Sequence, residues 1–531
     1  MLRPSSLPHA RARVTALVLG LLAALTTIGL GAVLSPATAA PRDPTQPLVP
    51  KIRSITPGYV PERGPIVVRG TVTNATDQVW TAINVHGFIG SVPITTPADL
   101  AEATQTPLAF DVGNRITLPG TFDHIDSLPP GETRSFVVRL PRSALPVSAP
   151  GVYWFGVHVL GDNGHGGSRN AVGRDRTFIP LVPSPTNASP PPEATALMLP
   201  VRAAVVRGTD GAIEDPAAWT QSLQTGALHE LVNLGQAAHG HPLTWLVDPA
   251  VVDTVRALAH GNPPRTLGNP PRTGQGESPS ASPSASATDS SAAAGGTTPS
   301  SATEQVARRW LRQMHRLLAS GTGEVLGLPY GDVAVESATT YDDALLAHAF
   351  HRTGDMLRPW GLPLSSAVAP PEGRTTGDAV AGLPSNTDVL LHDSGVRGTA
   401  PTVAEVNDRR LVLTASEAAK GGPGPVDPRS PLALRQRILS EAALRYLGDQ
   451  QPLVVELPLD PHHRVGRSFF TGLDVPWLRL TTLNGATAVS AMSLNASRLR
   501  EPQDPQLGRH VYTIANQMLE KGRTLQTVLP G

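Results

Sequence analysis

Four carboxylates follow short apolar runs between residues 243 and 456. They are Asp248, Asp332, Asp393 and Glu456, and the run at residues 243–248 is typical. Such a run predicts a buried strand of a parallel sheet. The carboxyl ends of these strands converge on the face of a (β/α) barrel where active sites lie. A glycosidase needs two carboxylates there, one as the acid and one as the base or nucleophile. We therefore take the four acids as candidate catalytic residues.

The same acids also have a structural interpretation. A carboxylate at a strand end often caps the helix that follows, because it accepts hydrogen bonds from the first amides of that helix. Asp248 is followed directly by Pro249, and proline favours the first position of a helix. Capping therefore explains Asp248 better than catalysis does, and both interpretations stay open for the other three acids.

Three further residues are candidates for ligand binding. Tyr330 and Trp477 are predicted near strand ends, where an aromatic ring can stack on a sugar, although packing in the core explains them as well. His392 directly precedes Asp393, which would suit a base and the acid that orients it. Neighbouring residues of a strand point to opposite faces, so a structural role for His392 is the alternative.

The chain offers little to a metal ion or a cofactor. It contains no Cys, which excludes disulfides, thiolate metal sites and a Cys nucleophile. His392 with His462 and His463 is the one plausible metal cluster, but adjacent loop histidines are more often solvated than ligating. The Gly-rich runs lack the strand–loop–helix pattern of a phosphate site. We expect no metal site and no cofactor.

Two architectures are predicted in succession. Residues 51–182 carry short alternating runs and Pro/Gly turns, which predict an all-β immunoglobulin-like sandwich that serves as a spacer or binding surface. Residues 183–195 form a Pro-rich linker. Residues 196–482 alternate apolar runs with helical periodicity, which predicts an α/β domain, a (β/α) barrel of seven or eight strands. Its Pro/Ser/Ala-rich residues 261–302 cannot bury enough apolar surface and are expected to be a disordered insertion. Residues 483–531 are predicted to be a helical C-terminal segment.

The first 40 residues have the pattern of an export signal. Arg3, Arg11 and Arg13 precede an apolar run at residues 14–34, and small residues suited to cleavage follow at 37–39. The run is also long enough to span a bilayer, so membrane attachment through an uncleaved segment stays an alternative. Residues 41–50 form a Pro-rich tether. We expect an exported protein, either extracellular or associated with the cell envelope.

The charge balance excludes one class of partner. Lys and Arg together number 43, as do Asp and Glu. A nucleic-acid-binding surface would leave a basic excess, so we expect no nucleic acid partner. The scarcity of Lys and the abundance of Ala, Gly and Pro are typical of a GC-rich bacterial genome.

Several short motifs carry a resemblance to a known family. They are Gly-Thr-Val-Thr-Asn-Ala-Thr-Asp at 70–77, Leu-Pro-Pro-Gly at 128–131, Pro-Gly-Val-Tyr at 150–153, Thr-Trp-Leu-Val-Asp-Pro at 244–249 and Gly-Leu-Pro-Tyr-Gly-Asp at 327–332. With the export signal, they resemble an uncharacterised family of exported proteins from GC-rich Gram-positive bacteria, a domain of unknown function. The resemblance covers most of residues 50–525 and implies no activity. Members of that family continue into another β-rich region and a membrane helix, so we expect a shortened chain or a variant without the anchor.

The predicted barrel also resembles, more weakly, the polysaccharide deacetylases and related glycoside hydrolases. Those deacetylases hold a metal with an Asp-Asp pair and a His-x-x-x-His helix. Here Pro249 follows Asp248, and no such helix stands in a matching position. We therefore favour a non-catalytic binding or scaffold role at the cell surface, with a cell-wall glycan or an envelope protein as the partner. A carbohydrate hydrolase of the envelope and a membrane-tethered partner in envelope assembly are the alternatives.

Overall fold

The computed structural model describes most of the chain from residue 46 onward. The described residues are 46–108, 110–164, 170–264, 301–320, 322–370, 372–423, 427, 430–458, 464–503 and 507–528. The predicted export signal, nearly all of the insertion, and His462 with His463 lie outside them. None of the described helices combines the length and the apolarity that crossing a bilayer requires.

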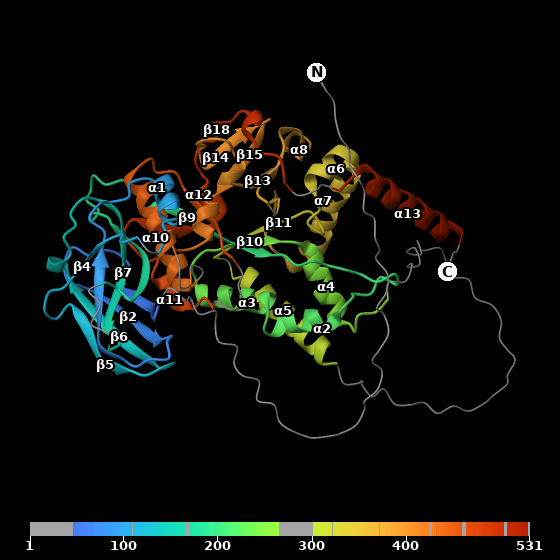
Figure 1. Cartoon of the computed structure of the whole chain (residues 1–531). Helices are drawn as coiled ribbons and strands as arrows, with labels where there is room; N and C mark the ends of the chain where they lie inside the picture. The colour runs from blue at the N-terminus through green and yellow to red at the C-terminus, as the bar shows by residue number, and fades with distance from the viewer. Residues whose placement is uncertain are drawn as a thin grey trace, which may run out of the picture. The chain divides into compact units, whose positions relative to one another are not determined.

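The N-terminal part consists of two antiparallel sheets (Figure 1). The first contains, in order, β1 (Leu48–Thr56), β2 (Pro65–Asn74) and β6 (Thr133–Pro141). The second contains β4 (Asn114–Arg115), β3 (Trp80–Ile89), β7 (Gly151–Asp162) and β8 (Gly173–Leu181), with β5 (Phe122–Leu128) also paired to β3. Buried side chains alternate with partly exposed ones along β2, and the buried ones join a core that both sheets share. The strand β1 begins inside the segment expected to be a tether.

The second part is a mixed sheet covered by helices. Its strand order is β16 (Leu453–Glu456), β9 (Glu193–Val201), β10 (Thr244–Val247), β11 (Glu324–Gly327), β12 (Ser365–Val368), β13 (Thr387–His392), β15 (Arg409–Thr414), β14 (Val403–Val406) and β18 (Met492–Ser493), with β17 (Leu478–Thr481) also on β9. All neighbours from β16 to β15 are parallel. A multidomain mixed α/β architecture with an N-terminal β-sheet region is therefore confirmed.

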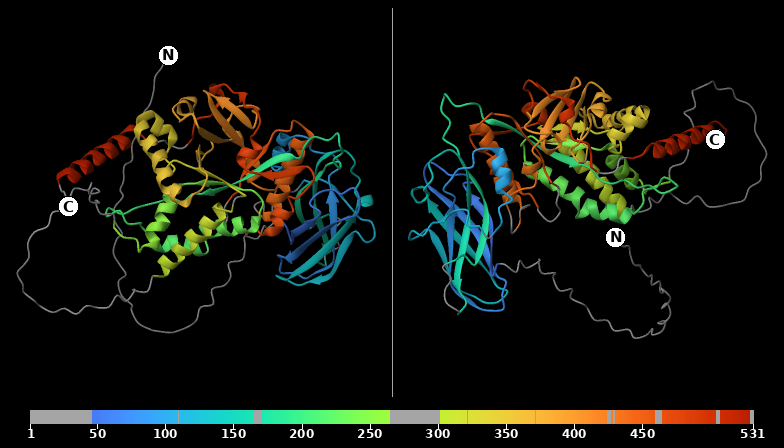
Figure 2. Two further views of the ribbon diagram at one scale, coloured as in Figure 1. Left: turned by 180° about the vertical axis from the view of Figure 1, so that it is seen from behind. Right: turned by 45° about the horizontal axis from the view of Figure 1, so that its top comes forward.

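Helices connect the parallel strands, as the helical periodicity predicted. They are α2 (Pro216–Gln224), α3 (Ala227–Ala238), α4 (Pro249–Ala259), α5 (Ala302–Leu318), α6 (Val335–Tyr341), α7 (Asp343–Leu357), α8 (Gly377–Ala381), α9 (Ser416–Ala419), α10 (Pro431–Leu447), α11 (Arg467–Thr471) and α12 (Leu483–Ala486). A short helix, α1 (Pro97–Ala103), belongs to the N-terminal part. Both views of Figure 2 place the last helix, α13 (Arg509–Val528), at the edge of the α/β part, where it contacts α6.

The expected closed barrel is not confirmed, because the hydrogen-bonded sheet is open. Closure would require β15 to pair with β16 along its length. Instead, β14 pairs with residues 409–412 of β15 and occupies that edge. In the described chain, one bond joins the two strands, from the Ala415 N–H to the Val454 carbonyl at 2.8 Å. The curved parallel strands still enclose a core of mostly small and aliphatic side chains, to which Leu246, Leu326 and Val412 contribute.

Helix α10 joins the two parts through a common core. It contacts β7 and β8 on one side and β9 and β16 on the other (Figure 1). The largest core contains Phe178 of β8 together with Leu439 of α10. The buried amide nitrogen of Gln436 donates to the Gly58 carbonyl at 2.9 Å and to the Phe178 carbonyl at 3.0 Å. A change of architecture at the Pro-rich linker therefore does not separate the cores.

Replacing Gln436 by leucine tests this junction. We expect a free energy of unfolding lower by about 1–3 kcal/mol, because two buried carbonyls lose their donor. Urea denaturation followed by circular dichroism and by tryptophan fluorescence provides the measurement. The exposed residue Gln221 of α2 gives the control, Gln221→Ala. An unchanged midpoint in Gln436→Leu would mean that the two Gln436 bonds contribute nothing to stability.

Candidate functional site

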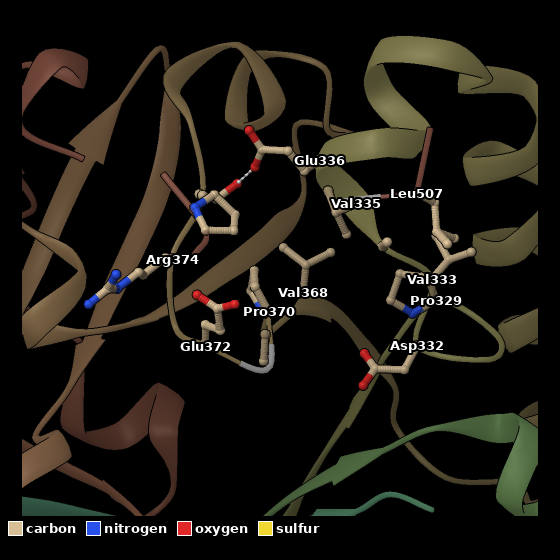
Figure 3. Close-up of a pocket in the computed structure, with 14 residues that line it drawn as sticks. Pro329, Asp332, Val333, Val335, Glu336, Val368, Pro370, Glu372, Arg374 and Leu507 are labelled. Carbon is tan, nitrogen blue, oxygen red and sulfur yellow. Dashed lines mark hydrogen bonds between the residues drawn. The ribbon is translucent and has the colours of Figure 1, made fainter. Parts of the chain in front are cut away.

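Three cavities lie at the carboxyl ends of the parallel strands, and we name each after one lining residue. The Arg202 cavity, of about 580 Å³, is lined by Arg202, Arg207, Asp248, Tyr330 and Asp332. The Arg437 cavity, of about 870 Å³, is lined by His392, Ser394, Ser416, Arg437 and Glu456 among others. The Glu372 cavity, of about 200 Å³, is lined by Asp332, Val335, Glu336, Val368 and Glu372 among others (Figure 3).

Asp248 caps a helix, as its proline neighbour predicted. Its side chain is buried, with the residue 3% exposed, and it lies at the N-terminus of α4. The Oδ1 atom accepts bonds from the N–H of Ala250 and of Gly331, each at 2.9 Å. Burial raises the pKa of Asp248 to about 6, although the two amides favour the ionised form. The capping interpretation of Asp248 is confirmed, and its carboxyl group also lines the Arg202 cavity.

Asp332 lies in the same cavity but is held by an arginine. Gly331 and Asp332 both have positive φ angles, 78° and 47°, a conformation that is uncommon for residues other than glycine. The Arg202 Nε lies 3.0 Å from the Asp332 Oδ2, and the Arg202 Nη2 also donates to the Ala369 carbonyl. Burial raises the pKa of Asp332, and the Arg202 charge opposes that rise. Arg202 thus ties together the ends of β9, β11 and β12.

Tyr330 lines the Arg202 cavity with its polar end engaged. Its hydroxyl donates to the Asp253 Oδ2 at 2.6 Å. The Arg352 guanidinium lies over the ring, 5.3 Å from its centroid. The face covered by Arg352 is therefore occupied by a cation, and stacking of a sugar on Tyr330 stays a prediction for the other face.

The remaining two acids and His392 gather near the Arg437 cavity. His392 and Glu456 line it directly. Asp393 is exposed and accepts bonds from the Ser394 N–H at 2.8 Å and from the Ser416 Oγ at 2.5 Å, so it joins the turn after β13 to the start of α9. The four acids therefore fall into two groups: Asp248 and Asp332 in one cavity, Asp393 and Glu456 around the other.

A glycine fixes the position of His392. Gly373 has a φ of 62°, and a Cβ atom there would lie 2.1 Å from Cγ of the His392 ring. The His392 N–H also donates to the Gly373 carbonyl at 3.0 Å. Only glycine fits this close approach, so the loop after β12 sets where the imidazole lies.

Trp477 does not lie at this face. It immediately precedes β17, which runs parallel to β9, so it is placed at the amino ends of the strands. The residue is 2% exposed and packs edge-to-face on Tyr59 at a centroid distance of 5.0 Å. The structure thus gives Trp477 the core-packing role and leaves no exposed ring for a sugar.

The Glu372 cavity combines apolar walls with carboxylates. Figure 3 shows Val335 and Val368 between Glu372 on one side and Asp332 on the other. Glu336 accepts a bond from the Thr375 Oγ1 at 3.0 Å, and Glu372 accepts one from the Gln503 N–H at 2.6 Å. Glu372 was missed from the sequence because no apolar run ends on it.

Several other lining residues carried no sequence signal. Arg202 follows β9 directly, and its position one residue beyond an apolar run was the available clue. Arg437 lies inside a helix, where only its spacing of four from Glu441 stands out. Across the described residues, no group of three or more His, Asp or Glu side chains is arranged to hold a metal ion.

The Asp248→Asn substitution tests the raised pKa. Because the folded pKa of about 6 exceeds the usual 3.8, the protonated acid favours folding at low pH, and that contribution is lost as the pH rises through about 6. The asparagine Oδ1 can still accept both amide bonds. From pH 4 to pH 7 we expect the wild type to lose roughly 2 kcal/mol of stability relative to the variant, measured by urea denaturation. Parallel pH profiles of the two proteins would contradict the assignment.

Comparison with known proteins gives a family but no activity. No curated protein sequence matches the chain. Among solved structures, it is similar to a β-glucosidase from Listeria innocua in complex with glucose, at 14% identity and a TM-score of 0.17, covering 25% of this chain and 16% of that one. It is also similar to β-glucosidase 3B from Thermotoga neapolitana in complex with glucose, at 12% identity and a TM-score of 0.16, covering 26% and 16%. Such low scores carry no argument about activity.

The family model has a much longer match. The model described as "Family of unknown function (DUF6049)" matches residues 8–353, well over half of the chain. This span includes both N-terminal sheets and the strands that carry Asp248 and Asp332. The chain belongs to this family of unknown function.

Proposed function

We propose that this chain is an exported cell-envelope protein that binds its ligand without turning it over, and that the Arg437 cavity is the binding site. One observation carries the proposal: three of the four acids at the strand ends are engaged in structural contacts. Asp248 caps α4, Asp332 is paired with Arg202, and Asp393 joins the turn after β13 to the start of α9. Catalysis by two carboxylates would need a pair free to exchange protons with a substrate.

The Arg437 cavity suits a polar ligand. Hydroxyl groups of Ser394, Thr414 and Ser416 line it, and a hydroxyl both donates and accepts hydrogen bonds. Its volume of about 870 Å³ is within the range of small-molecule sites. A fragment of a cell-wall glycan or of its peptides would match this chemistry.

The N-terminal part contributes to the same cavity. Thr104 and Gln105, which follow α1, form part of the wall. The Thr104 hydroxyl donates to the Ala101 carbonyl at 2.6 Å, which fixes the end of that helix. The N-terminal part, which we infer to be immunoglobulin-like, therefore acts as more than a spacer in this proposal.

A hydrolase is the second candidate, and one observation favours it. Asp248 has a pKa raised to about 6 and shares a cavity with Asp332, and perturbed acids in a cleft are typical of acid–base sites. In that case Asp248 would supply the proton and Asp332 would be the second carboxylate. The two amide bonds to Asp248 argue against this role, because they favour its ionised form.

Binding and turnover are separated by incubating the exported protein with purified cell-wall sacculi. We expect the protein to sediment with the sacculi while no reducing ends or acetate enter solution. Ser394→Trp, which fills the Arg437 cavity from an exposed position, should reduce sedimentation, and Asp248→Asn should leave it unchanged. Release of reducing ends by the wild type, and its loss in Asp248→Asn, would instead establish the hydrolase.

The proposed export has a direct measurement. The small residues at 37–39 predict cleavage near Ala40, so mass spectrometry of the exported protein should find a mature N-terminus at Ala40 or Pro41. Recovery of a chain that retains residues 14–34 in the membrane fraction would contradict cleavage and support the tethered alternative.

A further inference from the structure

The guanidinium of Arg437 keeps an unused donor at the Arg437 cavity. The residue is 1% exposed and lines the cavity. Its Nε and Nη2 atoms donate to the Glu441 Oε1 at 3.1 and 2.8 Å, but its Nη1 has no hydrogen-bond partner within the described part of the chain. A buried donor without a partner is unfavourable. A ligand oxyanion is the acceptor that best suits a guanidinium.

A carboxylate without a donor among the described residues, that of Glu456, lines the same cavity. Glu456, at the end of β16, is half-buried, and no described residue forms a hydrogen bond or an ion pair with its carboxylate. Arg437 does not reach it, because no ion pair within 4.0 Å joins the two. The other charges of the lining, Lys420 and Glu417, are paired with each other. Among the described residues, the Nη1 of Arg437, whose other two nitrogens bond Glu441, and the carboxylate of Glu456 thus remain without partners in one cavity.

These charges restrict the class of ligand. A simple anion would be attracted by Arg437 and repelled by Glu456, and a simple cation would meet the reverse. A zwitterion satisfies both groups at once, since it carries a carboxylate and an ammonium in one short molecule. In a dipeptide, Ser394 and Ser416 can also bond the amide between the two charged groups.

We propose that the Arg437 cavity binds a zwitterionic α-amino acid or dipeptide, with the ligand carboxylate on Arg437 and the ligand ammonium on Glu456. This rests on the proposed binding function and names its ligand class. Glu456 acts as a binding residue in this assignment, and no bond of the ligand is broken.

Calorimetric titration of the exported protein tests the ligand class. The probes are alanine, alanyl-alanine, N-acetyl-alanyl-alanine, alanyl-alanine amide and inorganic phosphate. We expect alanine or alanyl-alanine to bind. The ratio of their two affinities distinguishes an amino acid site from a dipeptide site. Blocking either end should weaken dipeptide binding about tenfold or more, since each block removes a charge-assisted hydrogen bond. Phosphate should not bind measurably.

Two variants test the assigned contacts. Arg437→Met should abolish zwitterion binding, and Arg445→Met is its matched control. Arg445 also loses an ion pair with Glu441 on the same helix, but it does not line the cavity. Glu456→Gln should bring the N-acetylated and free dipeptides to equal affinity. Circular dichroism is the check that Arg437→Met folds. Because Glu456 is only half-buried, the Glu456→Gln variant tests the site even if Arg437→Met does not fold.

Each other outcome overturns the proposal in a distinct way. Equal binding of blocked and free dipeptides by the wild type would exclude a zwitterion site. Binding of phosphate alone, lost in Arg437→Met, would leave an oxyanion site in its place. If no probe binds while the protein still sediments with sacculi, the ligand class is wrong and the binding function stands. If sedimentation also fails, both proposals fall.

Discussion

Helix α10 lies between two apolar surfaces, so each of its polar side chains must find a partner inside the protein. A helix that is buried all round normally carries few such residues, yet this one contains Gln436, Arg437 and Glu441, all buried. Gln436 bonds two carbonyls of the N-terminal part. Glu441 pairs with Arg437 and with Arg445. The Gln436 bonds hold the helix to the N-terminal part, whereas the pairs of Glu441 lie within the helix and compensate its buried charges.

Two arginines that line cavities, Arg202 after β9 and Arg437 in α10, differ in how many of their donors have partners. Arg202 finds a carboxylate and a carbonyl, and it holds three strand ends together. Arg437 finds one carboxylate oxygen, which occupies two of its three nitrogens. The same side chain therefore has a structural role in the Arg202 cavity, whereas in the Arg437 cavity one of its donors lacks a partner among the described residues. The number of available partners, more than the residue type, is what distinguishes the two arginines and supports the proposal that the Arg437 cavity binds a ligand.

Local patterns in the sequence predicted much of the α/β part, because short apolar runs and Asp-Pro junctions are local features. The run at 243–248 and the cap at Asp248 are examples. The open sheet was not predictable from such local patterns. β14 forms an antiparallel hairpin with β15 and occupies its edge, but the apolar residues of β14 resemble those of a barrel strand. Trp477 was misplaced for a simpler reason: it begins its apolar run, so strand direction alone puts it at the amino end. The partners of Arg202 and Arg437 are tertiary contacts without a local signal.

The loop after α1 brings the N-terminal part to the wall of the Arg437 cavity. Thr104 and Gln105 form cavity wall, while α1 itself contacts α10. Gln436 and Arg437 are neighbours on that helix. Arg437 lines the cavity, while Gln436 bonds two carbonyls of the N-terminal part. A displacement of those sheets relative to α10 would break the bonds of Gln436 and move the wall of the cavity at the same time. The shape of the Arg437 cavity therefore depends on the junction between the two parts.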